Sequence, residues 1–203
     1  MKKTITINLN GMLFNIDDDA YTRLEEYMKR IEAHFSGQDE SNEIMNDIEA
    51  RIAELLNERL GGGKKAVSLS DIEEIIKTMG NPDEFAETEQ EDRNNHHYHH
   101  THRPKRLYRD PDNRVLGGVC GGIGAYMNID PVIFRIIFVI SFFGFGVGLL
   151  IYLVLWIVIP EAVTTAQKLE MRGDPVNVSN IGSFIKDEFE NVKNSFKGKK
   201  TRS

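Results

Sequence analysis

The sequence predicts a small α+β head, a β-hairpin plus helices, followed by an α-helical membrane domain and an amphipathic C-terminal helix. Three observations support this fold class. The first is an Asn-Gly pair between two segments in which apolar and polar residues alternate. The others are an unbroken apolar run over 132–159 and apolar residues spaced by three and four in the tail. We divide the chain into a head (1–90), a linker (91–108), a membrane domain (109–161) and a tail (162–203).

The head begins with a predicted β-hairpin over about 3–16. Its two alternating runs flank Asn10-Gly11, and a type I′ turn needs positive φ at both of its central residues. Ile5, Ile7 and Leu9 share one face of the first strand.

Three predicted helices follow the hairpin. Apolar stripes with helical spacing indicate helices over about 17–35 and 41–60. The residues SDIE at 70–73 form a candidate capping box for a third helix, and Pro82 is suited to start a short fourth one. Residues 68–87 also resemble a helical module of bacterial membrane-anchored regulators, which hints at regulation by protein contact.

Charge divides the chain sharply. Residues 1–92 hold 10 Lys and Arg against 22 Asp and Glu, a net of −12, and residues 93–203 hold 15 against 9, a net of +6. Anionic lipid attracts the basic part and repels the acidic head, and an acidic head argues against binding nucleic acid. The first residues have no apolar leader, so we expect the head to stay in the cytoplasm.

The linker holds five of the six histidines, at 96, 97, 99, 100 and 102. His96, His97, His99, His100 and His102 are weak candidates for a Zn²⁺, Ni²⁺ or Cu²⁺ site, or for a cluster that charges on acidification. A polar tether without a metal is the interpretation we favour, and we expect no cofactor.

A glycine-rich stretch precedes the apolar run. It has no Gly-Lys-Ser/Thr for a phosphate loop, and no strand precedes it as a dinucleotide site requires. Small residues every four positions instead predict a helix that packs closely against another helix, within one chain or between copies in a homo-oligomer. The helix-packing candidates are Gly117, Gly118, Gly121, Gly122 and Ala125. Asp130 and Pro131 then predict the cap and first residue of a new helix.

The apolar run leaves two topologies open. The first topology is a tilted single span, because a straight helix of 28 residues is about 42 Å long and the hydrocarbon of a bilayer is about 30 Å thick. The other is a re-entrant hairpin, because glycines 144, 146 and 148 could divide the run into two helices of about 12 residues. We expect Arg135, Tyr152 and Trp156 to lie at the membrane interface.

Residues 109–161 resemble the phage-shock-protein C (PspC) domain. The resemblance rests on Leu116, Gly117, Gly118, Val119, Cys120, Gly121, Gly122, Ala125, Tyr126, Asp130, Pro131, Arg135, the glycines from 144 to 148, Tyr152, Trp156, Pro160 and Glu161. The layout is similar to the larger PspC-domain proteins of Bacteroidetes-type bacteria. The resemblance implies a protein of the bacterial inner membrane that acts in the envelope-stress response, through contacts with other membrane or peripheral proteins and without catalysis.

The tail predicts an amphipathic helix over 178–196, which could lie on anionic membrane, pair with a partner helix or pack on the head. We therefore expect a non-enzymatic stress sensor or regulator that contacts the lipid bilayer and other stress-response proteins. The alternative is a membrane-shaping or pore-forming, toxin-like effector, because a wedge and an amphipathic tail also suit that role.

Overall fold

The computed structural model describes residues 3–61, 64–81 and 105–200. The chain divides into two compact units. The head unit comprises residues 1–98 and 177–203, and the middle unit comprises residues 99–176. The predicted helix at Pro82 and the five linker histidines lie outside the described residues.

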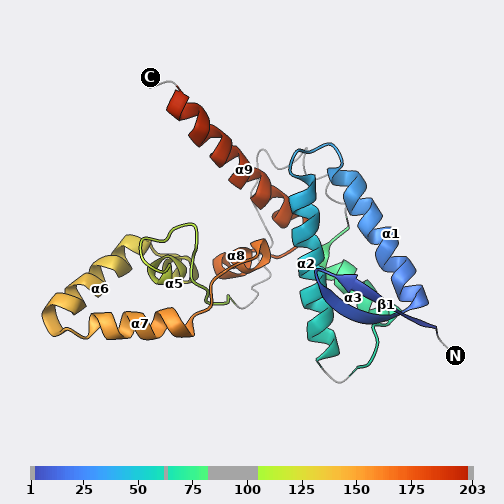
Figure 1. Cartoon of the computed structure of the whole chain (residues 1–203), viewed down its shortest axis with the longest axis horizontal. Coiled ribbons are helices and arrows are strands. Elements are labelled where there is room, and N and C mark those ends of the chain that lie inside the picture. Colours follow the sequence, from blue (N-terminus) through green and yellow to red (C-terminus); the bar gives the residue numbers. More distant parts are fainter. Residues whose placement is uncertain (1–2, 62–63, 82–104, 201–203) are drawn as a thin grey trace. The chain divides into compact units, whose positions relative to one another are not determined.

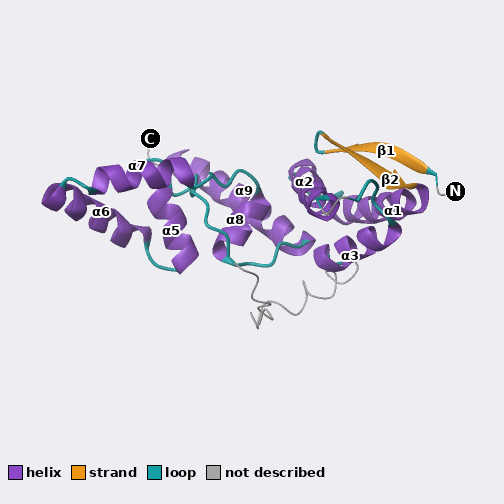
Figure 2. Ribbon diagram, turned by 90° about the horizontal axis from the view of Figure 1, so that it is seen from below, coloured by secondary structure: helices purple, strands orange, loops and turns teal. Residues whose placement is uncertain are grey.

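The head unit opens with the expected β-hairpin. Strand β1 (Thr4–Leu9) pairs antiparallel with β2 (Met12–Asp17), and Leu9 lies opposite Met12. Asn10 and Gly11 both have positive φ, 48° and 78°, as a type I′ turn requires, so this prediction is confirmed. Figure 2 shows the two strands as a twisted ribbon beside the helices.

Three helices bury their apolar stripes against one another and against the hairpin. They are α1 (Asp18–Phe35), α2 (Ser41–Leu60) and α3 (Leu69–Met79). The buried residues with helical spacing are Leu24, Tyr27, Ile31 and Phe35 in α1, Ile44, Ile48, Ile52 and Leu56 in α2, and Ile72, Ile75, Ile76 and Met79 in α3. This spacing explains why the sequence predicted the first two helices correctly.

The start of α3 corrects the prediction. The helix begins at Leu69, and its capping box joins Ser68 to Asp71, not Ser70 to Glu73. The buried Asp71 carboxylate accepts hydrogen bonds from the Ser68 hydroxyl (2.6 Å), the Ser68 backbone N–H (3.0 Å) and the Lys64 ammonium (2.7 Å). Burial alone would raise the pKa of Asp71, but these donors outweigh it and lower the pKa from 3.8 to about 2.

Asp71→Asn is expected to destabilise the head unit by about 1–2 kcal/mol at neutral pH, because it removes a buried, hydrogen-bonded charge. A carboxyl whose folded pKa is depressed contributes stability above its unfolded pKa, and that stability is lost as the pH falls through the folded pKa. The difference between the two proteins should therefore shrink from pH 4 towards pH 2 in urea-unfolding curves. A difference that stays constant over this range would contradict the assignment.

Helix α9 (Val178–Lys200) completes the head unit. Its first half is buried at Val178, Ile181, Phe184 and Ile185, and it packs against α2. A Cβ atom at Gly182 would lie 2.9 Å from the Phe35 ring, so α9 also approaches the end of α1 closely. Of the three placements left open for this helix, the structure shows its first half on the head.

The middle unit contains four described helices. They are α5 (Val119–Met127), α6 (Pro131–Phe145), α7 (Gly148–Val158) and α8 (Thr165–Arg172). The Asp130 carboxylate accepts a hydrogen bond from the Val132 backbone N–H (2.8 Å) and caps α6, with Pro131 at its first position, as predicted. Helices α6 and α7 fold back on each other as a hairpin (Figure 1).

The predicted transmembrane domain is wrong. None of the described helices is both long enough and apolar enough to cross a bilayer. The apolar run divides because Gly146 takes the left-handed conformation, with φ of 69°, and ends α6. Gly148 then lets α7 approach α6, since a Cβ atom there would lie 2.7 Å from the Phe142 backbone nitrogen.

Candidate functional site

Arg109 joins the beginning and the end of the middle unit. Its backbone N–H donates to the Pro160 carbonyl (2.8 Å), and its carbonyl accepts from the Ala162 N–H (3.0 Å). Its guanidinium donates to the carbonyls of Ile159 and Gly117, each at 2.9 Å, and lies 3.3 Å from the Glu161 carboxylate. Arg109 therefore ties its own segment to two others, Gly117 and residues 159–162, at the base of the α6–α7 hairpin.

The glycines of α5 pack against the segment 108–113. A Cβ atom at Gly122 would lie 1.8 Å from the Tyr108 carbonyl oxygen, and one at Gly121 would lie 2.9 Å from the Asp110 Cβ. At Gly118, which has φ of 78°, it would lie 2.4 Å from the Asp110 carbonyl oxygen. The backbone that approaches these glycines so closely belongs to a loop of the same unit, not to another helix.

The two other helix-packing candidates have different surroundings. Gly117 has φ of 57° and lies under the Trp156 indole, since a Cβ atom there would be 2.7 Å from Cδ1 of that ring. Ala125 is half-buried and lines a polar hollow with Asp110 and Arg172.

The α6–α7 hairpin is apolar and exposed on several faces. Between residues 131 and 159 the only charged residue is Arg135. The exposed large apolar side chains are Val132, Ile133, Ile136, Ile137, Val139, Ile140, Phe142, Phe143, Val147, Leu149, Leu150, Ile151, Leu153, Val154, Trp156, Ile157 and Val158. A contiguous apolar surface of this kind is typical of a protein or membrane contact.

Polar groups gather where the hairpin joins the rest of the unit. The Arg135 guanidinium, in the second turn of α6, donates to the Asn113 carbonyl (2.8 Å). The Tyr152 hydroxyl donates to the Leu116 carbonyl, and its ring meets Phe138 edge-on at 5.5 Å. Trp156 lies in the last turn of α7. Arg135 and Trp156 are thus on the half of the hairpin away from its Gly146 turn, and Tyr152 is near the middle of α7.

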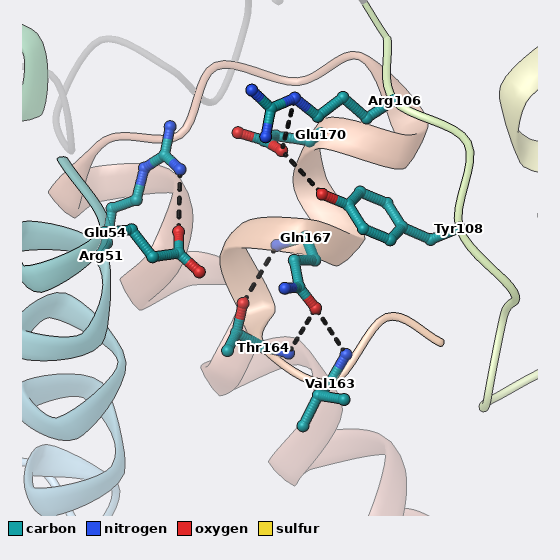
Figure 3. Close-up of polar contacts among 8 residues, drawn as sticks. All are labelled: Arg51, Glu54, Arg106, Tyr108, Val163, Thr164, Gln167 and Glu170. Atoms are coloured by element: carbon teal, nitrogen blue, oxygen red, sulfur yellow. Dashed lines mark hydrogen bonds and ion pairs between the residues drawn. The ribbon is translucent and has the colours of Figure 1, made fainter. Parts of the chain in front are cut away.

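Helix α8 is an element that the sequence analysis missed. Its capping box joins Thr164 and Gln167, whose side-chain oxygen accepts from the Val163 N–H at 2.8 Å (Figure 3). Glu170 on the same helix accepts from the Tyr108 hydroxyl (3.5 Å) and lies 3.9 Å from the Arg106 guanidinium. The sequence TTAQ at 164–167 was the available signal for this helix start.

Two chemical groups of the described residues bear on metal binding and on thiol chemistry. Among them, no three His, Cys, Asp or Glu side chains are grouped so that they could hold a metal ion. Cys120 is buried in α5, and burial raises the pKa of its thiol, which disfavours the reactive thiolate. The contacts that the structure shows at this site are apolar packing, hydrogen bonds and the Arg109–Glu161 ion pair.

Comparison with known families identifies two parts of the chain. Residues 105–162 match the family model of the PspC domain, and residues 26–88 match the family model described as HAAS. The search of the curated proteins and the search of the solved structures found no match. The similarity to Bacteroidetes-type proteins stays a prediction. The chain therefore carries a PspC domain, which contains the glycine-packed base and the apolar hairpin, together with a HAAS domain in its head.

Proposed function

We propose that this protein is a non-enzymatic regulator of the bacterial envelope-stress response that works at the inner membrane. A PspC domain points to a stress-response-associated role. In our proposal, the α6–α7 hairpin buries its apolar side chains in one side of the bilayer without crossing it. The acidic head stays in the cytoplasm and contacts other membrane or peripheral proteins.

The exposed hairpin is the observation that carries this proposal. In water, apolar side chains on an exposed helix pair cost free energy in proportion to their area, and lipid removes that cost. Both helices are too short to span about 30 Å of hydrocarbon, since 15 residues rise about 22 Å and 11 residues about 16 Å. The half of the α6–α7 hairpin near the Gly146 turn has no charged residue, as expected for the part that enters lipid.

The polar residues of the hairpin support the same orientation. Arg135 and Trp156 lie on the half that joins the rest of the unit, and the Tyr152 hydroxyl, from the middle of α7, reaches the Leu116 carbonyl. Arg extends its charge towards water, while Tyr and Trp prefer the headgroup region, so all three fit a membrane surface at that level. The net charge of −12 on residues 1–92 would keep the head away from anionic lipid.

Phe143→Asp is expected to weaken binding of the full chain to vesicles at least about tenfold, because a charged side chain in hydrocarbon costs about 2.5 kcal/mol or more. Phe143 is 82 % exposed, so the substitution should leave the fold intact. Flotation with vesicles of phosphatidylethanolamine and phosphatidylglycerol measures the bound fraction.

Leu13→Asp is the matched control, since Leu13 is 73 % exposed on the head hairpin. It should float as the unaltered chain does. Equal flotation of the two variants would contradict insertion of the α6–α7 hairpin. A concentration-dependent dimer that does not float would indicate that a second copy covers the hairpin instead.

One observation also supports the alternative function, a membrane-shaping or pore-forming effector. Two short helices joined at a tight turn form a wedge, and a wedge could also bend or perforate a membrane. Release of a dye trapped in the same vesicles would favour that alternative. Binding without release, together with changed stress-gene transcription in cells, would favour the regulator.

A further inference from the structure

A cavity of about 280 Å³ lies in the middle unit between the α6–α7 hairpin, α5 and the loop before α5. Its wall is mostly apolar. Helix α7 contributes Gly148 and Leu149, and α5 contributes Cys120. The volume is close to the lower end of the range for small-molecule sites.

The residues of α6 that line this cavity change from charged to apolar along the helix. Arg135, Phe138, Val139 and Phe142 line it at positions i, i+3, i+4 and i+7, over about 10 Å of helix. The first of these residues is cationic and the others are apolar. The cavity therefore has one charged end, beside Asn113, and one apolar end near the Gly146 turn.

The charged end is suited to an anion. In the described part of the chain, the Arg135 guanidinium hydrogen-bonds only to the neutral carbonyl and amide oxygens of Asn113, at 2.8 and 3.4 Å. Both bonds use Nη2, which leaves other N–H groups of the fork available. A phosphate oxygen would receive a charge-assisted hydrogen bond there.

We propose that this cavity holds the part of one acyl chain that is nearest the headgroup of an anionic phospholipid, whose phosphate group binds Arg135. The inference rests on the proposed function, because the hairpin must reach lipid for the chain to enter. In the orientation argued above, the charged end lies at headgroup level and the apolar end lies deeper. A lipid bound there would occupy the cavity in the same orientation as in the surrounding leaflet.

Native mass spectrometry of the full chain in an uncharged detergent tests the inference. With phosphatidylglycerol and phosphatidylcholine at equal concentration, the chain should retain one phosphatidylglycerol with a preference of about tenfold. Arg135→Gln should abolish this preference. Arg114→Gln, which removes a charge outside the cavity wall, should not. Equal retention of the two lipids by the unaltered chain would overturn the inference.

A second pair of variants tests the position of the acyl chain. Leu149→Trp fills the cavity and should abolish lipid retention. Leu150→Trp, at a neighbouring residue that is 64 % exposed and outside the wall, should preserve it. The same loss in both variants would contradict binding in the cavity.

The thiol of Cys120 gives an independent readout, because it is the only cysteine in the chain and it lines the cavity. Phosphatidylglycerol should slow its reaction with N-ethylmaleimide several-fold more than phosphatidylcholine does.

Vesicle flotation distinguishes failure of the cavity site from failure of the proposed membrane placement. A chain that floats but does not discriminate between the lipids refutes the cavity site alone. A chain that retains phosphatidylglycerol but does not float refutes the membrane placement.

Discussion

Gly122→Val is expected to unfold the PspC domain, with a loss of about 3 kcal/mol or more. The added Cβ atom would lie 1.8 Å from the Tyr108 carbonyl oxygen and 3.1 Å from the Arg109 Cα atom. Both are backbone atoms, and Arg109 is tied to residues 159–162, so neither side of the contact can move freely. Hydrogen exchange of the α5 amides in detergent measures the loss within this unit.

Gly144→Ala is the matched control. Nothing lies within 4 Å of the Cβ atom that it would add, and Gly144 is an exposed residue within α6. Alanine should be neutral there or stabilise the helix by up to about 1 kcal/mol. Unchanged α5 exchange in Gly122→Val would show that the segment 108–113 does not pack on α5 as described.

Ile181→Asp is expected to destabilise the head unit by about 4 kcal/mol. Ile181 has no exposed surface, so the substitution removes apolar burial and places a carboxylate among apolar groups. Val192→Asp changes the same helix where the side chain is 53 % exposed, and it should cost less than about 0.5 kcal/mol. Urea unfolding monitored by circular dichroism compares the two variants.

The two α9 variants also show which part of the helix packs on the head. If both lower stability equally, the whole helix packs on the head. If neither does, α9 is not part of the head core. The expected difference would leave the exposed side chains of Phe189 and Val192 available for lipid or for a partner helix.

Local patterns predicted most of the head, because each signal acts within a few residues. The Asn10-Gly11 turn and the stripes of α1 and α2 are examples. The boundary of α3 was missed by two residues, because Ser68 and Ser70 are both acceptable caps in the sequence. Only the position of Lys64 and the burial of Asp71 distinguish them.

The middle unit was harder to predict, because identical residues have different roles there. Gly144 lies within α6, Gly146 ends that helix with positive φ, and Gly148 lies against α6. Hydropathy does not distinguish these roles, so the sequence left a single span and a re-entrant hairpin both open. The α5 glycines were noticed, but their contact partner is a loop at 108–113 without a periodic pattern, which spacing rules for helix pairs do not detect.

The insertion of the PspC domain between α3 and α9 has a consequence for the order of biosynthesis. The ribosome produces residues 99–176 before α9, yet Val178, Ile181, Phe184 and Ile185 belong to the head core. The apolar hairpin therefore leaves the exit tunnel while the head is still incomplete. A nascent chain thus exposes its apolar hairpin before α9 can complete the acidic head.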